Sequence, residues 1–215
     1  MKRSQVLALL IALLIPLAVY AKDDNKSLPD AAKQGDSDAV KSLLDKGTDI
    51  NSTDGEGSTA LIQAAFWGRP DIAKLLIDKG ADVNARNKYG RTALMAASET
   101  GRTEVVRWLL AKGADVKARN KDGRSALIEA AARGHVETAQ ALIEAGADVN
   151  AKSNDGRTGL MLASYWGHPK MVEALLNKGA RADEKDKSGY VALDFAKAQG
   201  HKEVVEVLNR IVSKH

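Results

Sequence analysis

Apolar and polar positions recur along most of the chain with a period of 33 residues. In one copy of this pattern, a short first helix has a small apolar face made of Ala93, Leu94, Ala96 and Ala97. Thr92 stands just before that helix, where its hydroxyl can cap the first turn. Residues 103–111 are predicted to form a second helix, with an apolar stripe made of Val105, Val106, Leu109 and Leu110.

Three sets of glycines keep the same step of 33 residues, one from Gly35 to Gly200, one from Gly47 to Gly179 and one from Gly57 to Gly189. Gly113 follows the second helix, where a left-handed C-terminal cap is expected. Gly123 ends the sequence Asn-Lys-Asp-Gly, which is typical of a tight turn. Each unit is therefore predicted to be helix, turn, helix and a projecting hairpin loop.

The motifs G-x-T-A-L, A-A-x-x-G and L-L-x-x-G-A-D-V-N-A are clearest around residues 87–118. In this combination they resemble an ankyrin repeat, and the resemblance covers roughly residues 26–213. It implies an all-α repeat solenoid, an ankyrin-repeat stack of helix-turn-helix units with projecting β-hairpin loops. The Pro and His of the family's Thr-Pro-Leu-His are absent from every unit. Packing is expected to replace that polar network, through Ile62, Met95, Ile128 and Met161.

The period divides the chain into a leader, two end units and four full units. The end units differ in composition, as capping repeats do. The predicted divisions are a signal peptide at 1–21, an N-terminal capping repeat at 22–57, full repeats at 58–90, 91–123, 124–156 and 157–189, and a C-terminal capping repeat at 190–215.

The N-terminus has the layout of a secretory signal: two cations, an uncharged apolar run over residues 6–21, then polar residues. As a helix this run would cover about 24 Å, short of a hydrocarbon core of roughly 30 Å, and Pro16 would disturb it. We expect cleavage after Ala21, which leaves no stable membrane anchor, and a periplasmic location in a bacterium. The alternative is a membrane-tethered ankyrin scaffold, held by an uncleaved N-terminal segment.

Composition removes several classes of function. The 215 residues include no Cys, which excludes disulfides, thiol nucleophiles and cysteine zinc sites. Lys and Arg number 32 and Asp and Glu 28, and loss of Lys2 and Arg3 with the signal reduces the balance to 30 against 28, too small an excess to favour nucleic acid. In the absence of any catalytic or nucleotide-binding motif, we predict no enzyme activity, no small-molecule substrate and no cofactor.

Three histidines, His135, His168 and His201, follow the repeat step, so we predict no metal site there. In the family that the chain resembles, this Gly-His pair braces the turn between the two helices. The same role is expected here.

The resemblance implies that partners dock on a concave face made of the first helices and the loop tips. The residues at these places form the predicted partner-binding set, which is Phe66, Trp67, Tyr89, Arg91, Arg124, Arg133, Arg157, Tyr165, Trp166 and Tyr190. Aromatic side chains of this kind dominate binding energy at interfaces, and the cations suit an acidic protein surface. Two alternatives stay open: Phe66 and Tyr165 pack against the neighbouring repeat, or the loop cations are plain solvated charge.

Ten loop cations face only Glu56, Asp122 and Asp155 in this interpretation. The sequence thus predicts a monomeric, non-enzymatic module that holds one or more other proteins as a stabiliser, an inhibitor or an immunity-type neutraliser of a toxin.

Overall fold

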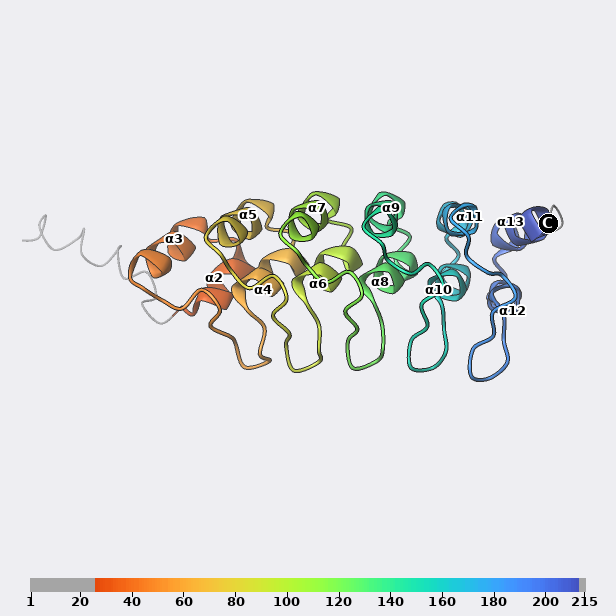
Figure 1. The fold of residues 1–215 in the computed structure, drawn as a ribbon, viewed down its shortest axis with the longest axis horizontal. Coiled ribbons are helices and arrows are strands. Elements are labelled where there is room, and N and C mark those ends of the chain that lie inside the picture. The colour runs from red at the N-terminus through yellow and green to blue at the C-terminus, as the bar shows by residue number, and fades with distance from the viewer. Residues whose placement is uncertain (1–25, 213–215) are drawn as a thin grey trace, which may run out of the picture.

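The computed structural model describes residues 26–212, so the predicted signal peptide and its cleavage site at Ala21 lie outside the described residues. Within this range the chain forms helices and loops, coloured along the chain in Figure 1. The helices are α2 (Leu28–Gln34), α3 (Ser37–Asp45), α4 (Ala60–Phe66), α5 (Pro70–Asp78), α6 (Ala93–Glu99), α7 (Thr103–Ala111), α8 (Ala126–Ala132), α9 (Val136–Glu144), α10 (Gly159–Tyr165), α11 (Pro169–Asn177), α12 (Ala192–Ala198) and α13 (Lys202–Val212).

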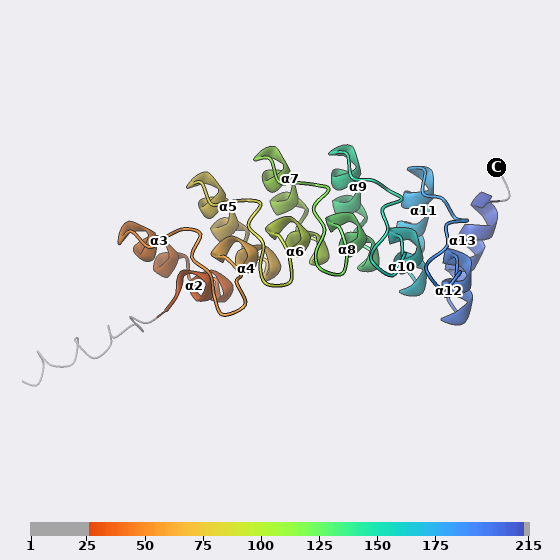
Figure 2. The same ribbon diagram turned by 60° about the horizontal axis from the view of Figure 1, so that its bottom comes forward.

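The helices form two parallel rows. The first helices of successive units (α2, α4, α6, α8, α10, α12) pack side by side. The second helices (α3, α5, α7, α9, α11, α13) form the other row, above the first in Figure 1. The loops project from the row of first helices, as Figure 1 shows, and the turned view of Figure 2 shows both rows running the length of the stack. The all-α repeat solenoid predicted from the sequence is confirmed.

The first helices of the four full units begin at a hydroxyl side chain. The Oγ atoms of Thr59, Thr92, Ser125 and Thr158 each accept a hydrogen bond from the backbone amide three residues on, at 3.3 Å. In the last unit Val191 has no hydroxyl, and the carboxylate of Asp194 instead accepts from the Val191 amide at 3.0 Å. Asp194 therefore replaces an apolar core residue of the other units with a cap for the terminal helix.

Small and branched apolar side chains fill the space between the rows. Alanines on the first helices are buried and let neighbouring helices approach closely, and the leucine of each T-A-L motif is almost fully buried. The four residues that stand where the family has His are buried as well: Ile62, Met95, Ile128 and Met161. The prediction that packing occupies these positions is confirmed.

The loops project as predicted, but they are hydrogen-bonded turns rather than paired strands. The Asn87 amide donates to the Arg91 carbonyl at 3.0 Å, which closes one loop. Among residues 26–212 the β-pairing is limited to one isolated bridge between Thr53 and Thr59. The loops bond to one another instead: the amides of Lys88, Lys121, Asn154 and Lys187 each donate to the preceding loop, at 2.8–3.0 Å.

The histidines brace the turns between helices, as the resemblance implied. The Nε2 of His135 donates to the Glu99 carbonyl at 3.1 Å, and His168 and His201 repeat this contact to the carbonyls of Ala132 and Tyr165. Each ring lies against the turn glycine of the preceding unit, which has a positive φ that suits glycine. Each His therefore joins its own unit to the unit before it.

None of the helices described between residues 26 and 212 has the length and the apolar character needed to cross a lipid bilayer.

Candidate protein-binding face

The exposed large apolar side chains of the described residues all lie on one side of the stack. They are Trp67, Tyr89, Trp166 and Tyr190, each 46–55% exposed. Trp67 and Trp166 end first helices, and the two tyrosines lie in projecting loops. We call this side, formed by the first helices and the loops, the concave face.

An aromatic pair lies near the N-terminal end of the concave face. Phe66 packs partly into the core and meets Trp67 edge to face, with ring centroids 5.5 Å apart. The indole Nε1 of Trp67 donates to Gln63 at 3.0 Å, and the ammonium of Lys33 lies 5.4 Å from its ring. Trp67 is thus fixed in orientation while nearly half of it stays exposed.

A larger aromatic cluster lies near the C-terminal end. Tyr165 meets Trp166 at 5.0 Å and Phe195 of the next unit at 6.1 Å, and Phe195 also meets Tyr190 at 6.1 Å. The guanidinium of Arg157 lies 5.2 Å from the Phe195 ring. Phe195 was missing from the predicted set. It holds the same place in its unit as Gln63 does in another, and that position was not counted among those that face a partner.

Phe66 and Tyr165 are therefore half-buried and contribute to packing, as one of the two interpretations allowed, while Trp67 and Trp166 project next to them.

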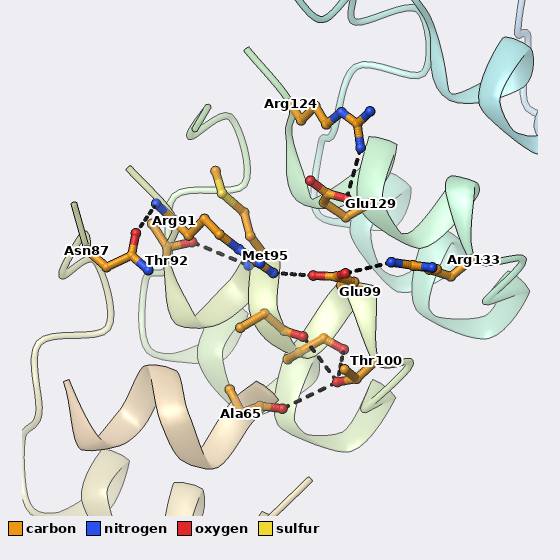
Figure 3. Close-up of polar contacts among 12 residues, drawn as sticks. Ala65, Asn87, Arg91, Thr92, Met95, Glu99, Thr100, Arg124, Glu129 and Arg133 are labelled. Atoms are coloured by element: carbon orange, nitrogen blue, oxygen red, sulfur yellow. Dashed lines mark hydrogen bonds and ion pairs between the residues drawn. The ribbon is translucent and has the colours of Figure 1, made fainter. Parts of the chain in front are cut away.

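The middle of the concave face is charged. Glu99 lies between two arginines, which approach its carboxylate from opposite sides in Figure 3. Arg133 Nη2 donates to Oε1 at 2.9 Å, and Arg91 donates to Oε2. Burial alone would raise the pKa of Glu99, but the hydrogen bonds and charges of the two arginines outweigh it and lower that pKa. Glu99 is therefore a charged residue that links its own repeat to the next one.

Glu129 is less well satisfied than Glu99. It is 8% exposed, and its Oε2 lies 3.6 Å from Arg124 Nη1, farther than a hydrogen bond (Figure 3). Burial raises the pKa of Glu129, and the negative charge of Glu99 adds to this, while the positive charge of Arg124 opposes it. The carboxyl group of Glu129 therefore holds its proton more tightly than an ordinary glutamate.

Two adjoining hollows follow the concave face. The first, of about 450 Å³, is the central groove, lined by Tyr89, Arg91, Glu99, Asn120, Asp122, Arg124, Glu129, Ala132, Arg133 and Trp166. The second, of about 250 Å³, is lined by Lys33, Glu56, Ser58, Ile62, Gln63, Phe66, Trp67, Asn87, Tyr89, Arg91 and Ala96. Tyr89 and Arg91 line both hollows, so seven residues of the predicted set meet along one continuous surface, and Arg157, Tyr165 and Tyr190 line neither hollow.

The expectation that the cations face only three acidic residues is wrong. Arg91, Arg124 and Arg133 pair with Glu99 and Glu129, and Arg157 lies 3.1 Å from Asp155 and 3.8 Å from Asp186. Only acidic residues near the turns were counted in that expectation, whereas Glu99 and Glu129 lie on the helices α6 and α8, and Asp186 lies in the loop of the next unit.

Several other loop cations bind neighbouring loops rather than extending into solvent. Arg86 donates to the Arg119 carbonyl, Lys88 to the Gly55 carbonyl, and Lys152 to the Lys185 carbonyl at 3.0 Å. Each of these bonds joins residues one repeat apart. The loop cations thus stabilise the row of loops, and the cations that face the groove are a smaller set.

Comparison with known proteins agrees with the repeat stack. A family model for ankyrin repeats in three copies matches residues 28–120, 89–153 and 127–212. A search of curated proteins finds no match.

Proposed function

This chain belongs to the ankyrin-repeat family, a family of protein–protein interaction modules, and on that premise we propose that it holds another protein on its concave face after export to the bacterial periplasm. The module is non-enzymatic. It works by docking a rigid, preformed surface, so its effect on the partner is to stabilise it, inhibit it or neutralise it as an immunity protein does.

One observation carries the proposal: the exposed large apolar side chains of residues 26–210 all lie on the concave face. Isolated apolar residues scattered over a surface need no explanation, but a one-sided set marks an interaction site. Trp67 and Trp166 stand three repeats apart, at the two ends of the charged middle. Neighbouring helices pack 8–10 Å apart, which places these two anchors roughly 25–30 Å from each other.

Charge suggests the chemistry of the partner. The arginines of the central groove reach outward, and Arg133 is the most exposed of them. An acidic segment of a partner protein would meet these guanidinium groups first, with its apolar side chains on the tryptophans. The chain acts as a monomer in this proposal, because its two end units cap the stack.

The proposal is tested by affinity capture from a native periplasmic extract. The bait is residues 22–215, and the comparison bait carries Trp67→Ala and Trp166→Ala. If each indole contributes on the order of 2 kcal/mol, the double variant loses well over tenfold in affinity for the retained protein. Arg107→Ala, on the exposed side of α7 in the other row of helices, is the matched control and should bind as the wild type does. Equal retention by all three baits would discard the concave face as the site.

Export is a separate part of the proposal. Mass spectrometry of the protein from the native host should find an N-terminus at Lys22. An intact N-terminal segment would favour the alternative, a membrane-tethered scaffold that uses the same binding face.

A further inference from the structure

The carboxylates of the central groove are recessed and its guanidinium groups reach outward. The side chains of Glu99 and Glu129 are 15% and 10% exposed, whereas that of Arg133 is 56% exposed. Glu99 occupies one terminal nitrogen each of Arg91 and Arg133, which holds these two guanidinium groups in place. An arginine has five N–H donors, so most of the donors in the groove remain open to a bound group.

Glu129 is the weak point of this arrangement. A buried carboxylate is costly unless cations and hydrogen bonds satisfy it. Glu99 has two arginines at close range, but Glu129 has Arg124 at 3.6 Å, and in the described part of the chain no cation comes nearer. Glu129 therefore holds Arg124 loosely, and a proton on Glu129 removes the cost of releasing Arg124.

The charges that face Glu129 come from three sides. The loop before α8 contributes Asp122 and Arg124, α8 itself contributes Arg133, and α6 with its preceding loop contributes Arg91 and Glu99. On the α10 side the groove is lined by Trp166, which is uncharged. Three arginines thus oppose three carboxylates, and the groove gains one positive charge when Glu129 takes up a proton.

We propose that the central groove receives an acidic side chain of a protein partner, which replaces Glu129 as the counter-ion of Arg124 while Glu129 gains a proton from solvent. This inference rests on the proposed function and specifies the chemistry of the same site. Tyr89 and Trp166 stand at either side of the groove and pack against apolar residues that flank the acidic one. Binding is then linked to proton uptake, so affinity rises as the pH falls, as long as the partner's own carboxylate stays charged.

The probe is a synthetic peptide, acetyl-Gly-Phe-Glu-Glu-Phe-Gly-amide, with a twin in which both glutamates are glutamines. Its affinity for the wild-type chain is measured by nuclear magnetic resonance at pH 7.5 and pH 5.5. Free glutamate has a pKa of about 4.3, so the probe stays charged at both values. Proton linkage predicts affinity about threefold or more higher at pH 5.5. The carboxyl carbon signal of Glu129 should move toward its protonated position as the probe is added.

Glu129→Gln mimics the protonated state and is the decisive variant. It should bind the probe at pH 7.5 at least as tightly as the wild type does at pH 5.5, with little further gain at lower pH. Glu137→Gln, on the exposed side of the adjacent helix α9, is the matched control and should keep the wild-type pH dependence. The histidines are unchanged in both variants, so any pH dependence they add is common to all three proteins.

Three results would overturn the inference: no binding of the probe to the wild type at pH 5.5, equal binding of the glutamine twin, or weaker binding by Glu129→Gln than by the wild type at pH 7.5. The proposed function stands or falls on other data, the capture experiment with the tryptophan variants. A partner captured through the tryptophans, with no effect of Glu129→Gln, would keep the first proposal and remove this one.

Discussion

The turn between the two helices of a unit gives a sharp test of how neighbouring repeats hold one another. Gly134 has φ +72°, and a Cβ built there lies 2.9 Å from Cγ and Nδ1 of His168 in the next unit. The ring would have to move, and its hydrogen bond to the Ala132 carbonyl, 3.2 Å in length, would be lost. Gly134→Ala therefore adds both backbone strain and a broken contact between repeats.

Gly200 offers a matched control. It holds the same place in the last unit, with φ +73°, and a Cβ there meets nothing within 4 Å. A left-handed conformation costs a residue other than glycine about 1–2 kcal/mol, which is the expected loss in Gly200→Ala. Loss of the hydrogen bond made by His168 adds about 1 kcal/mol in Gly134→Ala. The expected total for Gly134→Ala is therefore about 2–3 kcal/mol.

Urea denaturation, followed by circular dichroism and by tryptophan fluorescence, measures both losses. For a domain of this size 1 kcal/mol shifts Tm by about 2–4 °C, so the two variants should differ clearly in thermal melts as well. His168→Ala completes a double-mutant cycle that does not depend on the terminal position of Gly200. With the ring gone, the double variant Gly134→Ala/His168→Ala should lose about 1 kcal/mol less than the sum of the single losses. Strict additivity, together with equal losses at Gly134 and Gly200, would refute the reasoning.

Two further predictions concern the buried glutamates. Glu99→Gln leaves Arg91 and Arg133 without their shared counter-ion, so we expect a loss of about 1–2 kcal/mol in the free energy of unfolding at pH 7 by urea denaturation. Because the pKa of Glu99 is lowered in the folded chain, its contribution is present above about pH 4.5 and disappears as the pH falls through the folded value; a difference that grows in acid would contradict this. The contribution of Glu129 to stability has the opposite pH dependence, because its pKa is raised in the folded chain. That contribution is full below about pH 4.5 and is lost as the pH rises through the folded pKa. The stability of Glu129→Gln should therefore fall less than that of the wild type between pH 4.5 and pH 8, and parallel curves would contradict the expectation.

The fold could be predicted from the sequence because every unit of the stack uses the same local features to start, end and pack its helices. The Thr or Ser before a first helix, the glycine after each helix and the apolar stripes act within one unit, so their spacing alone predicted the helices. The role of His135, His168 and His201 also followed from the period, because a residue repeated every 33 positions meets the same neighbour each time. The projecting loops also followed from the period, although β-pairing within residues 26–212 is limited to one bridge, and the bonds from each loop to the preceding loop were not expected.

The candidate site was harder to predict. The period showed which positions face the groove, and it brought together Tyr89, Arg91, Arg124, Arg133 and Trp166. It did not show that carboxylates neutralise the arginines. Arg91 and Arg124 pair with Glu99 and Glu129 of their own units, and Arg133 pairs with Glu99 of the preceding unit. A glutamate stands at each of these two positions in one unit alone, so no repeated motif marks the pairs.

That contrast separates the two kinds of position in this chain. A side chain that recurs in most units, such as the capping hydroxyl or the buried leucine, serves the stack, since every interface between units needs it. The positions of Glu99 and Glu129 differ from unit to unit: one reads Phe, Glu, Ala, Tyr and Ala, and the other reads Gln, Ala, Glu, Leu and Phe. Because the stack forms around every one of these residues, stacking does not require a glutamate at either place. Both glutamates face the central groove beside its arginines, so we expect them to act on what the proposed site binds as well as on the stability of the folded chain.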